Sequence, residues 1–207
     1  MDKKANDIII IRADMAKDVD VRAGMAKIFA EGFSQWLGFF SKDEVTIAKT
    51  FSHMFVLDQF YIAVVNGDVA GMVACTDGKT LSVRLNKKEL RKYLGWYKGS
   101  LAGIFLKKEF ENPFLNPPAN TGSIEFVGTS SKFRGQGIAL KIMEYIFENI
   151  PFAEYIIEEV ADTNTPAMSL YQKIGFIEYK SKPIPSKRAA KIGINRFVSL
   201  KLTPPGY

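Results

Sequence analysis

The sequence contains very few of the residues that build disulfide frameworks and metal sites. Among its 207 residues there is one cysteine, Cys75, and one histidine, His53. A lone cysteine excludes an internal disulfide. One histidine with one cysteine argues against a zinc site and against a Cys–His nucleophile pair. We therefore expect no metal, and we take the reducing cytoplasm as the default compartment.

Long apolar runs are also missing. No run reaches the roughly 18 residues that a membrane-spanning helix needs. The run from Ile8 to Ile11 is too short for the core of a signal peptide. There is no internal repeat and no low-complexity segment, and 47% of the residues are hydrophobic, as in an ordinary globular protein. We expect a single domain over residues 1–207 and no membrane partner.

The charge balance is moderately basic. The chain carries 28 basic and 22 acidic side chains, a formal net charge of +6. Such an excess can serve nucleic acid, an anionic membrane or an anionic small ligand, or simply keep the protein in solution. The basic residues are not gathered on one helix with interleaved aromatic residues, which is the usual footprint of nucleic-acid binding. We therefore expect no nucleic-acid partner.

Hydrophobic periodicity and turn residues divide the chain into strands and helices. We predict strands over residues 7–13, 59–65, 69–75, 80–85, 121–129, 155–160, 176–180 and 192–202. We predict helices over residues 18–40, 41–56, 86–110, 135–149 and 163–174. This order indicates an α/β (α+β) fold with a mixed central sheet of about six to seven strands flanked by helices. Residues 86–118 form a helical insertion in this plan.

Several local signals mark where elements begin and end. Ser41 and Glu44 form a capping box, which predicts Ser41 as the cap of the second helix. The Asn66-Gly67 pair predicts a tight hairpin turn, and Gly175 predicts the C-terminal cap of the helix before it. The helix over 86–110 is predicted to present one apolar stripe, formed by Leu90, Tyr93, Leu94, Tyr97, Leu101 and Ile104.

A glycine-rich turn between the strand over 121–129 and the following helix carries the clearest chemistry. It reads Arg134-Gly135-Gln136-Gly137-Ile138-Ala139. Glycines let a ligand approach the backbone closely, and the free amides and dipole of a helix N-terminus attract anions. Together they predict a diphosphate site, with Lys132 and Arg134 as nearby cations. The spacing fits neither the Rossmann fingerprint nor a P-loop.

These residues resemble motif A of the GNAT superfamily of N-acetyltransferases, in which Arg134, Gly137 and Ala139 fill the three defined positions. A second run, from Glu159-Val160 through Asn164, Ala167 and Leu170-Tyr171 to Gly175-Phe176, is similar to the superfamily's motif B. Both motifs occur in the expected order on strand–helix units, within residues 123–176. The N-terminal half fits the fold but carries no motif of its own.

The resemblance implies a site for acetyl-CoA where two parallel strands separate. Backbone groups of Val127, Gly128 and Thr129 would pair with the pantetheine arm. Asn164 would reach the pantetheine, and Tyr171 would face the thioester sulfur. Besides the Arg134 side chain, the pyrophosphate would be held by the amides of Gly135, Gln136, Gly137, Ile138, Ala139 and Leu140.

Two glutamates compete as general base. Glu125 resembles the proposed base of polyamine acetyltransferases, and Glu159 matches a glutamate of ribosomal-protein alanine acetyltransferases. A carboxylate among strand apolars costs desolvation unless it is partnered, which favours a functional role. Plainer interpretations stay open: either glutamate faces solvent or a lysine, Tyr171 is a core aromatic, Asn164 is an N-cap, and Arg134 is a surface residue.

The implied activity is direct transfer of an acetyl group from acetyl-CoA to a primary amine of a small molecule or peptide. An acyl-CoA-binding domain without catalysis is the alternative. The acceptor is not specified, and a homodimer stays open. The aromatic residues of the insertion either line an acceptor pocket or cover the core. The basic loop over 182–191 borders the acceptor side in this superfamily. His53 is expected in packing or at the surface, and Cys75 as a buried small hydrophobe.

Overall fold

The computed structural model describes residues 7–111 and 118–204. Its strands are β1 Ile8–Arg12, β2 Phe60–Val65, β3 Asp68–Thr76, β4 Thr121–Thr129, β5 Glu154–Ala161, β6 Ile177–Pro183 and β7 Arg196–Leu202. Its α-helices are α1 Val21–Leu37, α2 Glu44–Phe51, α3 Lys87–Phe110, α4 Ile138–Asn149, α5 Thr165–Ile174 and α6 Ser186–Ile192. Short 3₁₀ turns cover Ala13–Met15, Leu57–Gln59 and Ser131–Phe133.

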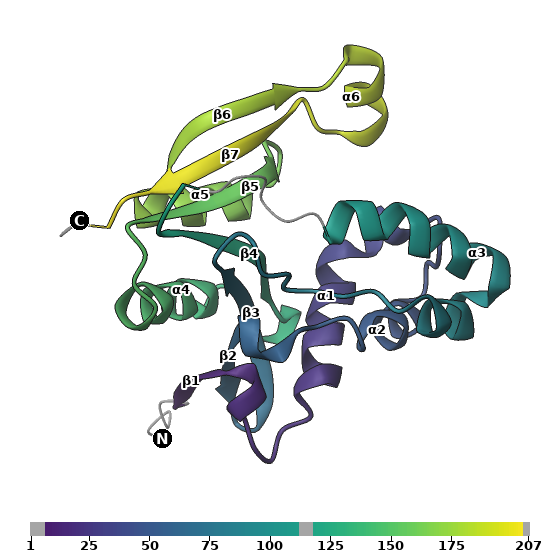
Figure 1. Cartoon of the computed structure of the whole chain (residues 1–207), viewed down its shortest axis with the longest axis horizontal. Helices are drawn as coiled ribbons and strands as arrows, with labels where there is room; N and C mark the ends of the chain where they lie inside the picture. The colour runs from purple at the N-terminus through teal and green to yellow at the C-terminus, as the bar shows by residue number, and fades with distance from the viewer. Residues whose placement is uncertain (1–6, 112–117, 205–207) are drawn as a thin grey trace.

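The strands form one seven-stranded sheet in the order β1-β2-β3-β4-β5-β7-β6. Every neighbouring pair is antiparallel except β4 and β5, which run parallel. One hydrophobic cluster packs α1, α2 and α3 against one face, and a second packs α4 and α5 against the other (Figure 1). The mixed sheet flanked by helices predicted from the sequence is confirmed.

The parallel pair separates almost at once. β4 and β5 pair only over Thr121–Ser123 and Glu154–Ile156. Just beyond, each strand has a bulge against its antiparallel neighbour, and each bulge contains a residue at positive φ: Phe126 at 48° and Glu159 at 53°. Bulges bend a strand and increase its twist. These two bulges explain why the strands diverge after three paired residues, as Figure 1 shows for β4 and β5.

Helix α3 is two helices joined at a glycine. Gly95 has φ 78° and ψ 167°, which no α-helical residue adopts. The second segment folds back on the first. Gly99 lies so close to Arg91 that a β-carbon on it would be 2.5 Å from Arg91 Cα. We call this helical hairpin, residues 87–110, the α3 hairpin. The one apolar stripe predicted for this helix does not form one buried face: Leu90 is buried, but Tyr93, Tyr97 and Ile104 are 36%, 68% and 62% exposed.

Three other expectations are corrected. Asp43, not Ser41, caps α2, because its carboxylate accepts from the amides of Val45 and Thr46. Residues 80–85 form no sheet strand, and only Val83 bridges to Phe55. The basic loop before the last strand contains helix α6.

The remaining turn signals are confirmed. Asn66 and Gly67 both take positive φ in the β2–β3 hairpin, as the Asn-Gly pair predicted. Gly175 ends α5 in the left-handed conformation at φ 105°. Among the helices of the described residues, none is long and apolar enough to cross a membrane.

Candidate functional site

The loop between β4 and α4 is anchored at its start and open at its end. The Ser130 amide donates to the Ala70 carbonyl at 3.0 Å, and the Ser131 amide donates to Glu31 Oε2 of α1 at 2.7 Å. Phe133 is buried in the core beneath α4. The four residues that follow, 134–137, are all exposed. The loop is therefore fixed in place while its glycine-rich part faces solvent.

The two glycines of this loop are required by its backbone. Gly135 and Gly137 have φ of 75° and 73°, and a β-carbon on either would meet nothing within 4 Å. Gly137 is the N-cap of α4, and no side chain caps that helix end. The first amides of α4 consequently have no partner within the helix and point into open space. This geometry suits a bound anion such as a phosphate.

The two cations near the loop differ in their freedom. Lys132 forms an ion pair with Asp68 at 2.5 Å and lies over the Phe133 ring. Within the described part of the chain, Arg134 has no acidic partner in ion-pair range. Because Lys132 is already paired with a carboxylate, it attracts a further anion less strongly. Arg134 is therefore the cation that remains available beside the glycines.

Among residues 7–111 and 118–204, no strand pairs with one edge of the half of β4 that leads into the loop. Gly128 and Thr129 pair with β3, whereas the pairing with β5 ended at Ser123. Val127, Gly128 and Thr129 are half-buried. A β-carbon on Gly128 would lie 2.7 Å from Ile28 of α1, so this glycine also lets α1 pack against the sheet. An extended ligand could pair with this free edge as an added strand does.

Glu125 lies two residues beyond the last residue of β4 that pairs with β5, and it is held by three hydroxyl groups. Its carboxylate accepts from Ser123 at 2.9 Å, from Thr76 at 3.3 Å and from Ser82 at 2.5 Å. All three hydroxyl residues are buried. Such donors compensate a carboxylate for lost water. The partner that the sequence could not identify is thus a set of hydroxyls from three chain segments.

The second predicted glutamate has a different setting. Glu159 is the bulge residue of β5, it is exposed, and its side chain forms an ion pair with Lys182 of β6 at 3.3 Å. Its neighbour Glu158, which sequence reasoning missed, accepts from Ser199 at 2.8 Å and from the Tyr179 hydroxyl. Glu125 and Glu159 lie on neighbouring strands, but their carboxylates have unlike surroundings.

Tyr171 lies on α5 in the core beneath the sheet. Its side chain is 4% exposed, and its ring packs edge-on against Phe176 at 5.9 Å. Burial raises the pKa of the hydroxyl above its usual value. The phenol therefore stays protonated at physiological pH and has a proton to donate. This packing is compatible with both interpretations of Tyr171, core aromatic and reactive group.

Asn164 is the N-cap of α5. Its side chain accepts from the Ala167 amide at 3.4 Å, as the cap interpretation expected. The residue is exposed, so the same cap position leaves its amide nitrogen accessible. A role toward a ligand is therefore open to it without loss of the cap.

The single histidine and the single cysteine lie away from the loop. His53 follows α2, and its Nε2 accepts from the Asn86 amide at 2.8 Å, which starts α3. Burial lowers the pKa of His53. Cys75 is buried in β3, and desolvation raises the pKa of its thiol to about 12. Within the described residues, no group of three or more His, Cys, Asp or Glu side chains could hold a metal ion.

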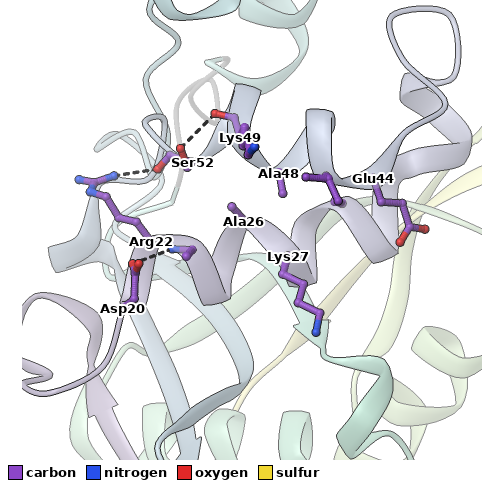
Figure 2. A pocket seen from close by; sticks show the side chains of 11 residues that line it. Asp20, Arg22, Ala26, Lys27, Glu44, Ala48, Lys49 and Ser52 are labelled. Atoms are coloured by element: carbon purple, nitrogen blue, oxygen red, sulfur yellow. Dashed lines mark hydrogen bonds between the residues drawn. The ribbon is translucent and has the colours of Figure 1, made fainter. Parts of the chain in front are cut away.

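A groove of about 460 Å³ lies between α1 and α2 and contains none of the predicted site residues (Figure 2). Its floor is formed by small residues, Ala23, Ala26 and Ala30 of α1 and Ala48 of α2. Two of its charged lining residues are already engaged with backbone groups at helix ends. Asp20 accepts from the Ala23 amide, and Arg22 donates to the carbonyls of residues 52, 53 and 55. We interpret this groove as a helix-packing seam.

The geometry defines a class of protein: a mixed sheet whose single parallel pair separates beside an anion-ready helix N-terminus. The sequence pattern of the acetyltransferase (GNAT) family matches residues 25–176. The chain belongs to the GNAT family of acetyltransferases. A search of curated proteins finds no match.

Solved structures with a similar fold agree. An N-acetyltransferase from Staphylococcus aureus Mu50 has 19% identity and a TM-score of 0.60, over 94% of this chain and 100% of that chain. The acetyltransferase yncA from Salmonella typhimurium with acetyl-CoA has 11% identity and a TM-score of 0.53, over 98% and 96%. The NatC complex bound to Gag peptide and CoA has 16% identity and a TM-score of 0.53, over 96% and 99%. At these identities the similarity shows the fold.

Proposed function

We propose that this chain transfers an acetyl group from acetyl-CoA to a primary amine, as one N-acetyltransferase domain with the α3 hairpin as its insertion. The observation that carries the proposal is the exposed loop Arg134–Gly137, which adjoins the free edge of β4. The diphosphate of the cofactor would bind the amides of α4 beside Arg134. Its pantetheine arm would lie along Val127–Thr129 and contact Asn164.

The chemical step uses groups on both sides of the separated strands. An alkylammonium acceptor has a pKa of roughly 10, so little of it is neutral at pH 7. Glu125, directly or through one water, removes the proton, and the free amine attacks the thioester carbonyl. A backbone amide near Val127 stabilises the oxyanion. The carbon–sulfur bond then breaks, and the Tyr171 hydroxyl donates to the leaving thiolate.

We favour Glu125 over Glu159 as the base because their contacts differ. The carboxylate of Glu125 is half-buried, is held by three hydroxyls, and has no cation in ion-pair range among the described residues. The carboxylate of Glu159 is exposed and already neutralised by Lys182. A general base must lie in a fixed position beside the acceptor, and the hydroxyls around Glu125 hold its carboxylate next to the point where β4 and β5 separate.

The second candidate function is acyl-CoA binding without catalysis. It would use the same loop but would need neither Glu125 nor Tyr171. Turnover by the purified protein separates the two. Acetyl-CoA is mixed with panels of amines, amino acids, peptides and aminoglycosides, and release of CoA is measured. Acceptor-dependent release supports the transferase. A cofactor-induced rise in melting temperature with no release from any acceptor would support the binding domain instead.

A further inference from the structure

The α3 hairpin presents large apolar side chains to solvent on its second helix, residues 96–110. Trp96 is 72% exposed, Tyr97 is 68% exposed, and Ile104 and Phe105 are each 62% exposed. The opposite side of the same helix faces the protein, where Gly99 and Ala102 are buried. The second helix is therefore apolar on two sides, and only one of them is covered by the described residues.

Three of the exposed side chains lie on one side of the second helix together with the half-buried Leu101. Residues 97, 101, 104 and 105 are spaced by four, three and one, which places them on one side of an α-helix. We call Tyr97, Leu101, Ile104 and Phe105 the outer stripe. On this helix Lys98 lies beside one edge of the stripe, and Lys108 follows its end. Figure 1 shows that α3 stands at the periphery of the molecule, away from β6 and β7.

The charge of the hairpin is concentrated and positive. Its residues 87–110 contain seven basic and two acidic side chains, whereas the whole chain has a net charge of only +6. Two of the cations lie over exposed rings: Arg91 is 5.4 Å from the Trp96 ring centre, and Lys92 is 4.9 Å from that of Tyr93. Basic and aromatic side chains are thus gathered on one hairpin, contrary to the sequence-based expectation.

We propose that the α3 hairpin docks the protein on an anionic lipid surface through the outer stripe. An apolar helical stripe bordered by lysines is the pattern of a helix that lies in a membrane interface. Tyrosine and tryptophan favour the boundary between acyl chains and water. Lysines on the hairpin meet the anionic headgroups, and their long stems extend along the apolar layer.

Charge and polarity favour an anionic bilayer over a second copy of the chain or a nucleic acid as the partner of the outer stripe. A second copy would bring an equally positive hairpin against the first, so an isologous contact between stripes meets like-charge repulsion. Nucleic acid would use the lysines and aromatic rings but would leave the aliphatic Leu101 and Ile104 against a polar backbone. A bilayer with anionic lipids satisfies both the charge and the aliphatic part of the stripe.

The test is co-sedimentation of the purified full chain with vesicles at about 0.1 M salt, where screening is moderate. Vesicles of phosphatidylcholine alone are compared with vesicles containing phosphatidylglycerol. The expected result is binding to the anionic vesicles, weakened by added salt. Ile104→Ser with Phe105→Ser, and separately Lys108→Glu, should each lower the partition about tenfold or more. Ile177→Ser, which removes an equally exposed side chain on β6, is the matched control and should bind as the unchanged protein does.

Several outcomes would overturn the proposal. These are no anionic-vesicle binding by the unchanged protein, unaltered binding by the stripe variants, or binding that Ile177→Ser weakens equally. Salt-dependent binding to DNA or RNA that exceeds vesicle binding would assign the hairpin to nucleic acid. A dimer in size-exclusion chromatography that Ile104→Ser dissociates would assign it to a second copy. The melting temperature of each variant shows whether it is folded.

Discussion

Glu125 and Glu158 lie on the same face of the sheet, one on each of the two parallel strands. Ser123 pairs with Ile156, and each glutamate stands two residues beyond its member of that pair, so both share its face. Both carboxylates accept from hydroxyls, Glu125 from Ser123, Thr76 and Ser82, Glu158 from Ser199 and Tyr179. Two acids therefore flank the point of separation on the face opposite α4 and α5. This pair of carboxyl groups supports the proposal of an amine as acceptor.

The first prediction concerns the cofactor loop. Gly137→Glu should abolish the rise in melting temperature that acetyl-CoA causes, because it adds a negative side chain where the diphosphate would bind. Gly193→Glu is the matched control. Gly193 has a similar φ of 68° and equally open surroundings but lies at the end of α6. The Gly193→Glu variant should lose stability as Gly137→Glu does, but its melting temperature should still rise with acetyl-CoA. A normal shift in Gly137→Glu would show that the loop is not the cofactor site.

The second prediction concerns the proton donor. Tyr171→Phe removes one hydroxyl and keeps the buried ring, so turnover should fall on the order of 10²-fold while acetyl-CoA affinity changes little. Tyr61→Phe, at another buried tyrosine beneath the same sheet face, should leave turnover unchanged. The measurement is the single-turnover rate at saturating acetyl-CoA, which isolates the chemical step. An unaltered rate in Tyr171→Phe would make Tyr171 a core aromatic only.

The third prediction ranks the acids. Glu125→Gln should slow turnover at pH 7 by about 10²-fold, and raising the pH should restore rate by supplying free amine. Glu159→Gln should retain the rate and pH profile, because it breaks only an exposed ion pair. The readout is kcat/KM against pH for all three proteins with one acceptor. The reverse pattern would make Glu159 the base, and two full-rate variants would leave proton removal to water.

A fourth prediction concerns pH and stability. Burial lowers the pKa of His53, so the unfolded state binds a proton more readily than the folded state does. The contribution of neutral His53 is fully present above the unfolded pKa of about 6.5. It is lost as the pH falls below that value toward the lower folded pKa. The melting temperature should therefore drop more between pH 7.5 and 5.5 in the unchanged protein than in His53→Gln. Equal drops in the melting temperature of the two proteins would contradict a lowered pKa of His53 in the folded state.

The fifth prediction concerns the α3 hairpin. Gly99→Ala should lower the free energy of unfolding by about 1–3 kcal/mol, because the new β-carbon meets backbone atoms of Arg91 at 2.5 and 2.6 Å. Gly32→Ala in α1 is the control, since a β-carbon there meets nothing within 4 Å. It should raise stability by up to about 1 kcal/mol through helix propensity. Urea denaturation of the three proteins measures both changes.

The parts of the fold that follow from local chemistry were predictable. The bounds of β4 match the prediction, and Asn66-Gly67 and Gly175 form the turn and cap that their residue types require. The α3 hairpin was missed because apolar and charged residues are both spread around its helices, so periodicity alone could not choose a buried face. The spacing of Gly95, Gly99 and Gly103 was the signal that the chain turns back on itself.

The sequence predicted the glycine-rich loop of the site, but it did not identify which acidic residues face each other across the separated strands. Arg134–Gly137 follow from glycine spacing at a strand–helix junction, which is a local pattern. Which β5 glutamate shares the face of Glu125 depends on how β5 pairs with β4, and the bulge at Glu159 ends the simple alternation of side chains there. No glycine marks that bulge, since Glu159 itself takes the positive φ. Only the strand registers identify Glu158 as the residue on that face.

The buried Cys75 makes the protein convenient for thiol chemistry. With its pKa raised to about 12, less than about one thiol in a thousand is ionised at pH 8, and the thiolate is the reactive form. A disulfide reagent that reports free CoA would therefore read the product of the reaction without a signal from the native enzyme. For the same reason, a cysteine introduced on the outer stripe would be the single fast-reacting site on the chain, open to a fluorophore or a spin label.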